Sequence, residues 1–183
     1  RSLSSYFKKM PVVSGFFTRQ INELVGIDIG TTTIKVCALS NTKGFFAVDN
    51  VVLKTYEQDL LNDGHVVDPD FLGNELRMIF EENKIKSRNA ACALSSYSVI
   101  SKKISVPYLQ DEELEKAISA EVENSIPFPL EEIYYSYYVL GMDPEKQSMI
   151  DIKIVPAKKE IVDGYVAAFN LADLPLQIID VDI

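Results

Sequence analysis

The residues best suited to chemistry form a short run of glycine, threonine and charged side chains, Asp-Ile-Gly-Thr-Thr-Thr-Ile-Lys, at residues 28–35. Gly30 carries no side chain, so a phosphate can approach the backbone closely there. Successive N–H groups from Gly30 to Thr33 can point at the phosphate oxygens. The hydroxyls of Thr31, Thr32 and Thr33 supply further donors. This order of residues is typical of a phosphate-binding turn.

Two charged side chains flank the turn. Asp28 can hold a hydrated Mg²⁺ ion, which usually keeps its waters and contacts few protein carboxylates. Lys35 lies two residues after Thr33, and an alternating strand would place both on one face, where Lys35 can neutralise phosphate charge. The same residues also fit an ordinary tight hairpin with Lys35 on a solvated face. Spacing alone does not separate these two interpretations.

The elements around the turn follow from the apolar pattern. Apolar runs at 24–29 and 34–39 predict a hairpin, and residues 45–56 predict a third antiparallel strand. Asp68 and Pro69 predict the start of a helix that reaches about residue 84. Residues 62–65 are polar and predict a loop. The small apolar residues 90–94 are typical of a buried central strand, which could run parallel to the first.

The pattern changes at Ser98, where a second unit is predicted. Its elements would be a strand reaching Val106, an acidic helix, two further strands and a helix over about 158–171, followed by a last strand at 177–181. We therefore expect four segments: a basic leader at 1–22, a nucleotide-contacting subdomain at 23–97, an inserted α+β subdomain at 98–177 and a return strand at 178–183.

Composition narrows the function classes. The net charge of -9 argues against a nucleic-acid partner, because phosphate neutralisation requires a basic surface. No segment approaches the ~20 apolar residues that span a bilayer, and no secretory signal is apparent, so we expect a cytoplasmic protein. Cys37 and Cys92 stand singly in apolar segments, which predicts buried structural thiols.

The run Gly26-Ile27-Asp28-Ile29-Gly30-Thr31-Thr32-Thr33-Ile34-Lys35 resembles the first phosphate motif of the actin, Hsp70 and sugar-kinase superfamily. The resemblance implies an α/β fold, namely an actin-like ATPase (ribonuclease H-like) lobe with a mixed sheet, helices and a small inserted α+β subdomain. It also implies ATP and Mg²⁺ as cofactors. The phosphate and metal contacts would come from Asp28, Gly30, Thr31, Thr32, Thr33 and Lys35, with Asp28 holding Mg²⁺ through water.

A narrower resemblance rests on several segments together. Residues 23–32, the run Ile126-Pro127-Phe128-Pro129-Leu130-Glu131-Glu132, and residues 98–107 and 178–182 are similar to PilM-like proteins of type IV pilus assembly. This implies a cytoplasmic scaffold at the inner membrane face. Its partners would be other pilus assembly proteins and the cytoplasmic tail of a PilN-like inner-membrane protein, bound in a groove between two subdomains.

Proteins of that family are nearly twice as long, so we expect this chain to carry the first lobe only, with the sequence ending before the second. ATP hydrolysis is not expected from this lobe alone, and whether the full-length protein hydrolyses ATP stays open. Asp180 and Asp182 resemble the start of the motif that joins the lobes. Either could polarise the attacking water, or both are surface carboxylates near a strand end.

Three alternatives stay open beside this interpretation. An FtsA-like cell-division protein would have the same architecture. A small-molecule kinase of the superfamily would need a catalytic aspartate between the lobes, for which the sequence offers no clear candidate. A GspL-like type II secretion component normally lacks an intact phosphate motif, and the run from Asp28 to Thr32 argues against it.

Overall fold

The computed structural model describes residues 23–94, 101–109, 111–143 and 148–181. The chain forms two compact units. The large unit contains residues 23–94 and 160–181, and the inserted unit contains residues 101–159. We describe each unit by itself.

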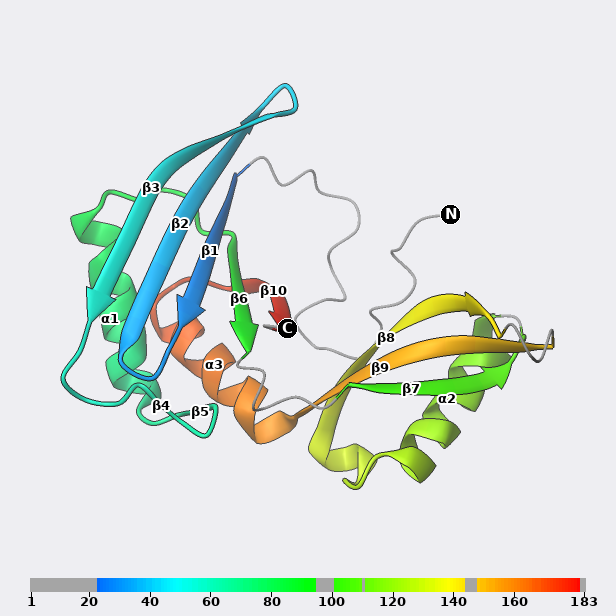
Figure 1. Cartoon of the computed structure of the whole chain (residues 1–183). Coiled ribbons are helices and arrows are strands. Elements are labelled where there is room, and N and C mark those ends of the chain that lie inside the picture. Colours follow the sequence, from blue (N-terminus) through cyan, green and yellow to red (C-terminus); the bar gives the residue numbers. More distant parts are fainter. Residues whose placement is uncertain (1–22, 95–100, 110, 144–147, 182–183) are drawn as a thin grey trace. The chain divides into compact units, whose positions relative to one another are not determined.

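The large unit is built on a five-stranded sheet in the order β10-β6-β1-β2-β3 (Figure 1). Its strands are β1 (Glu23–Ile29), β2 (Thr33–Thr42), β3 (Phe45–Thr55), β6 (Ala90–Leu94) and β10 (Leu176–Val181). β1, β2 and β3 pair antiparallel, whereas β6 runs parallel to both β1 and β10. The antiparallel meander and the parallel strand predicted from the apolar pattern are both confirmed.

Two helices, α1 (Pro69–Glu82) and α3 (Lys159–Leu171), lie against one face of this sheet (Figure 1). α1 begins as predicted, because the Asp68 side chain accepts a hydrogen bond from the Phe71 N–H at 2.9 Å. Both helices bury apolar side chains, among them Leu72, Leu76, Ile79 and Phe80 of α1 and Ile161, Val162, Tyr165 and Phe169 of α3. Within the described ranges, no helix is long and apolar enough to cross a membrane.

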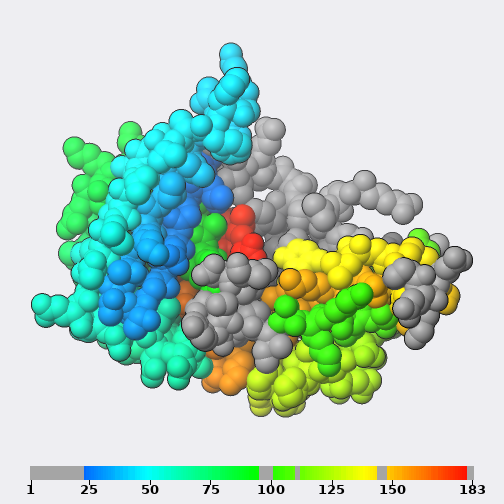
Figure 2. Space-filling view, viewed as in Figure 1, coloured from blue at the N-terminus to red at the C-terminus, as the bar shows by residue number. Residues whose placement is uncertain are grey.

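Besides the β1–β2 hairpin, the large unit has two hairpins with tight turns, β2–β3 and a smaller one at residues 61–66. Lys43 and Gly44 both have positive φ, which matches the right-handed twist of the strands that they join. The β2–β3 hairpin continues past Ser40, which pairs with the first described residue of β1, and extends as a projection (Figure 2). A second, smaller hairpin joins β4 (Leu61–Asn62) to β5 (His65–Val66), where the sequence had predicted only a loop.

The inserted unit is an α+β arrangement. A three-stranded antiparallel sheet in the order β7-β9-β8 is covered by one helix. Its elements are β7 (Lys102–Pro107), α2 (Asp111–Ser125), the short 3-10 helix η3 (Leu130–Glu132), β8 (Ile133–Met142) and β9 (Met149–Lys158). Ile118 and Val122 of α2 pack with Ile152 and Ile154 of β9 in a core whose members are almost fully buried.

The boundary of the insertion differs from the prediction. Residues 160–177 were assigned to the inserted subdomain, but they belong to the large unit. The reason is packing: Tyr165 and Phe169 of α3 are fully buried, and α3 lies against α1. The inserted unit therefore ends at Lys159, and the return to the large unit begins with α3. The predicted leader at 1–22 lies outside the described residues.

Candidate functional site

The turn between β1 and β2 is held by backbone hydrogen bonds from two directions. Within it, the Gly30 N–H donates to the Thr33 carbonyl at 2.8 Å. From the segment after β3, the Leu60 N–H donates to the Thr31 carbonyl at 2.6 Å, and the Tyr56 N–H donates to the Thr32 carbonyl at 2.9 Å. The carbonyl groups of Thr31, Thr32 and Thr33 therefore each accept a hydrogen bond.

The N–H groups of Thr31 and Thr32 donate no hydrogen bond to any of the residues that the structure describes. Both residues are at least partly accessible to solvent. Adjacent unpaired N–H groups in a turn form an anion-binding concavity, because their dipoles add and no side chain need intervene. The turn thus presents two backbone donors to a ligand.

Gly30 leaves room for the Thr33 hydroxyl. A Cβ atom at this position would lie 2.8 Å from Oγ1 of Thr33, closer than non-bonded atoms approach. The Thr33 hydroxyl therefore lies directly against the Gly30 backbone. Any larger residue at position 30 would force this hydroxyl to move.

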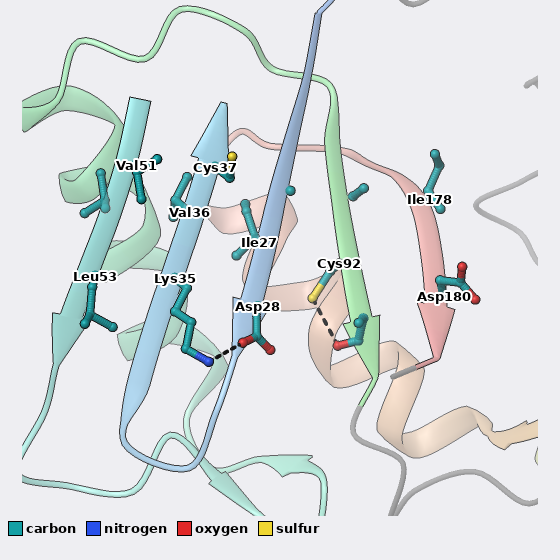
Figure 3. Close-up of a pocket in the computed structure, with 14 residues that line it drawn as sticks. Ile27, Asp28, Lys35, Val36, Cys37, Val51, Leu53, Cys92, Ile178 and Asp180 are labelled. Carbon is teal, nitrogen blue, oxygen red and sulfur yellow. Dashed lines mark hydrogen bonds and ion pairs between the residues drawn. The ribbon is translucent and has the colours of Figure 1, made fainter. Parts of the chain in front are cut away.

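Asp28 and Lys35 face each other across β1 and β2, where they are register partners. Lys35 Nζ lies 2.7 Å from Asp28 Oδ2, and both side chains are about half exposed, at 59% and 50% (Figure 3). An exposed ion pair of this kind contributes at most about 1 kcal/mol. A metal ion on Asp28 and a phosphate on Lys35 can therefore replace the pair at little energetic penalty.

The ion pair opens into a cavity of about 580 Å³ on the face of the sheet opposite α1 and α3. Gly26, Ala91 and Ala93 line it and keep it open, because they place little or no side chain above the strands. Val51 and Leu53 of the edge strand β3 line its apolar side (Figure 3). The cavity therefore combines a charged end with an apolar surface, as small-molecule sites commonly do.

Asp180 of β10 lines the same cavity as Asp28 and Lys35 (Figure 3). The structure thus brings one of the two candidate catalytic carboxylates to the candidate phosphate site. Asp182, the other candidate, lies outside the described residues.

The two cysteines differ from the prediction of two buried thiols. Cys92 is buried, and burial together with the charge of Asp28 raises the pKa of its thiol. Cys37 is only partly buried and lines the cavity. The strand period accounts for this, because Cys37 lies two residues after Lys35 and so shares its open face.

Sequence reasoning missed the residues that hold the turn. Tyr56 and Leu60 act through backbone N–H groups, which leave no signature in side-chain type. The register partnership of Asp28 and Lys35 was also missed, although a hairpin with a three-residue turn at 30–32 places these positions opposite each other.

The residues present fit a hydrated Mg²⁺ ion. Mg²⁺ is usually held by one or two carboxylates together with waters and substrate phosphates. Asp28 is accessible for this, and Asp180 offers a second carboxylate in the same cavity. The described part of the chain holds no cluster of three or more His, Cys, Asp or Glu side chains that could hold a metal ion.

Comparisons with known proteins bear on the fold and the family. The sequence model of the type IV pilus assembly protein PilM matches residues 26–183. A solved structure of a PilM–PilN type IV pilus biogenesis complex is similar with a TM-score of 0.78 and 27% identity, over 89% of this chain and 48% of the matched chain.

The cytoplasmic domain of EpsL, an inner-membrane component of the type II secretion system of Vibrio cholerae, is similar in fold alone. Its TM-score is 0.54 at 12% identity, over 86% of this chain and 57% of the matched chain. The chain thus spans about half the length of these two structures. The predicted fold, an actin-like ATPase lobe with an inserted α+β subdomain, is confirmed.

Proposed function

This chain belongs to the PilM family of type IV pilus assembly proteins, and we propose that it is an actin-like scaffold that binds ATP with Mg²⁺ and a PilN-like membrane partner. The observation that carries the nucleotide proposal is the pair of N–H groups at Thr31 and Thr32, which have no hydrogen-bond partner among the described residues and lie in the turn that joins the strands of Asp28 and Lys35. The cation and the carboxylate line the cavity, and the donors lie in the turn that joins their two strands.

Each residue of the turn would have a distinct task. The N–H groups of Thr31 and Thr32 and the hydroxyl of Thr33 would donate to phosphate oxygens. Lys35 would leave Asp28 and neutralise phosphate charge, and Asp28 would hold Mg²⁺ through water. The metal, when bound, supplies positive charge that offsets the charge of the phosphate oxygens. Asp180 is the candidate for polarising water because it lines the same cavity.

The partner proposal draws on the likeness to the PilM–PilN complex. A cytoplasmic tail of an inner-membrane protein would bind in extended form, through backbone hydrogen bonds and apolar pockets. Such binding would hold the protein at the cytoplasmic face of the inner membrane and leave other surfaces for further pilus assembly proteins.

Calorimetric titration of the whole protein tests both parts. One arm uses Mg-ATP, and the other uses a synthetic peptide of the cytoplasmic N-terminal tail of the PilN-like protein from the same organism. We expect saturable one-to-one binding in both arms. A folded protein that binds Mg-ATP but not the peptide would refute the proposed PilN-like partner. A protein that binds only the peptide would refute the nucleotide proposal.

A further inference from the structure

Tyr56 connects helix α1 to the candidate phosphate-binding turn. Its hydroxyl donates to Glu75 Oε2 of α1 at 2.9 Å. Its ring meets the ring of Phe71, also on α1, edge to face, with centroids 5.9 Å apart and an interplanar angle of 82°. Its backbone N–H donates to the Thr32 carbonyl at 2.9 Å. One residue therefore contacts the helix through its side chain and the turn through its backbone.

Glu75 is held from a second direction. Lys54 Nζ lies 2.6 Å from the same Oε2 atom, and it also lies 5.6 Å from the centroid of the Tyr56 ring. The Glu75 side chain is only 14% exposed, so this acceptor is fixed by neighbours instead of moving in solvent. Burial and the hydrogen bond to Glu75 raise the pKa of Tyr56, so its hydroxyl stays a proton donor even in alkaline solution.

Fixing a carbonyl also fixes an N–H group. A peptide unit is planar and trans, so its carbonyl and the following N–H point in opposite directions. The bond from Leu60 to the Thr31 carbonyl therefore sets the direction of the Thr32 N–H. The bond from Tyr56 to the Thr32 carbonyl fixes the next peptide plane, which carries the Thr33 N–H, and so holds the C-terminal side of the turn next to the Thr32 donor. Donors that are already oriented lose less freedom when an anion binds.

We propose that Tyr56 is a positioning residue of the anion site, which uses its anchorage on Glu75 and Phe71 to hold the turn that carries the donors. This inference rests on the proposed nucleotide function. It makes α1 part of the phosphate site, although α1 supplies no side chain to the cavity.

The test uses Tyr56→Phe, which removes only the bond to Glu75, and Tyr56→Ala, which also removes the ring. Tyr135→Phe is the control, because it removes a tyrosine hydroxyl, which contacts Ser119, in the inserted unit. Calorimetry gives the Kd for Mg-ATP. Hydrogen exchange of the ligand-free protein compares the Gly30 amide, bonded within the turn, with the Val25 amide, bonded to Asn89 at the far end of β1.

In Tyr56→Ala we expect the Kd to rise about fivefold, the factor that one hydrogen bond of typical net strength represents. Tyr56→Phe should show a smaller rise, and Tyr135→Phe none. Exchange should accelerate at Gly30 and not at Val25 in the Tyr56 variants. Equal acceleration at both amides, or an unchanged Kd in Tyr56→Ala, would overturn the proposal. A wild-type protein that does not bind Mg-ATP overturns the proposed function, and the exchange ratio then still decides whether Tyr56 holds the turn.

Discussion

Gly73 of α1 lies so close to Ala168 of α3 that a Cβ atom on Gly73 would be 2.7 Å from the Ala168 carbonyl oxygen. The same atom would be 2.7 Å from Cβ of Leu171. Neither neighbour is the end of a flexible side chain, so a larger residue would push the two helices apart. This contact sets how α1 lies on the sheet, and α1 in turn carries Glu75, which accepts from Tyr56.

Gly73→Ala should therefore destabilise the protein by about 1–3 kcal/mol, the usual range for overpacking. Helix propensity alone would predict the opposite sign, because alanine is favoured over glycine inside a helix by about 1 kcal/mol. Gly164→Ala in α3 is the matched control, since its nearest new neighbour would be Val66 Cβ at an ordinary 3.6 Å. Urea unfolding should show opposite signs for the two variants. If both variants are stabilised, the two helices can move apart at little energetic cost, and the predicted overpacking is wrong.

The Asp28–Lys35 pair predicts two different responses of ATP affinity. Lys35→Met should raise the Kd for ATP about tenfold or more with or without Mg²⁺, because it removes a charged donor. Asp28→Asn should abolish the gain that Mg²⁺ gives, and in EDTA it should bind ATP at least as tightly as the wild type, because a carboxylate repels phosphate. Isothermal titration in Mg²⁺ and in EDTA separates these effects.

Exposed residues outside the cavity supply the controls, Lys86→Met and Asp59→Asn. Both should leave the Kd and its Mg²⁺ dependence unchanged. If the controls lose as much affinity for ATP as the site variants do, the change in Kd results from the net charge of the protein and not from the site.

The sequence predicted the meander and the turn because their signals are local. The apolar alternation on either side of Gly30 and the Asp68–Pro69 helix start depend only on neighbours in the chain. The Asp63–Gly64 pair between β4 and β5 is also a local hairpin signal, and it could have been recognised despite strands of two residues.

The remaining features depend on distant partners. The apolar period of α3 shows that one face is buried, but it does not show which sheet buries it, so the boundary at Lys159 required the structure. The anchorage of the turn on Tyr56 and Leu60 depends on backbone groups that every residue except proline possesses. Such contacts follow from the fold and not from residue types.

Asp151 predicts a pH dependence for the inserted unit. Lys103 Nζ lies 2.7 Å from its Oδ2 and Ser105 Oγ donates to its Oδ1 at 2.6 Å, and these hydrogen bonds lower the pKa of Asp151. Because the folded-state pKa lies below the unfolded one, the stabilisation is present above the unfolded pKa and is lost as pH falls toward the folded pKa. Asp151→Asn should thus be less stable than wild type at neutral pH, with the difference shrinking below about pH 4.

Unfolding of both proteins by urea at a series of pH values measures this difference. Asp59→Asn, at an exposed position, should follow the wild-type curve. A gap between wild type and Asp151→Asn that stays constant down to acid pH would contradict the assignment. At alkaline pH the ion pair is lost through Lys103 instead. The hydrogen bond to Asp151 raises the pKa of Lys103, so the stabilisation by the pair is lost as pH rises through the folded-state pKa of Lys103.

Tyr165 offers a change that should stabilise the protein. Its hydroxyl is buried beneath the large sheet, and it has no hydrogen-bond partner in the described part of the chain. Burial raises the pKa of Tyr165, as expected for a phenol removed from water. A buried polar group without a partner lowers stability by roughly 1–3 kcal/mol, so Tyr165→Phe should recover part of that amount.

Tyr135→Phe is the matched comparison, because the Tyr135 hydroxyl lies 2.8 Å from Ser119 Oγ and its loss should destabilise by about 1 kcal/mol. The midpoints of thermal and urea unfolding should therefore rise for Tyr165→Phe and fall for Tyr135→Phe, although the two substitutions are chemically identical. If Tyr165→Phe destabilises as much as Tyr135→Phe, the Tyr165 hydroxyl has a partner beyond the described residues, either a buried water or another part of the chain. Stabilisation would instead show that the hydroxyl has no such partner and that Tyr165 is retained for its ring.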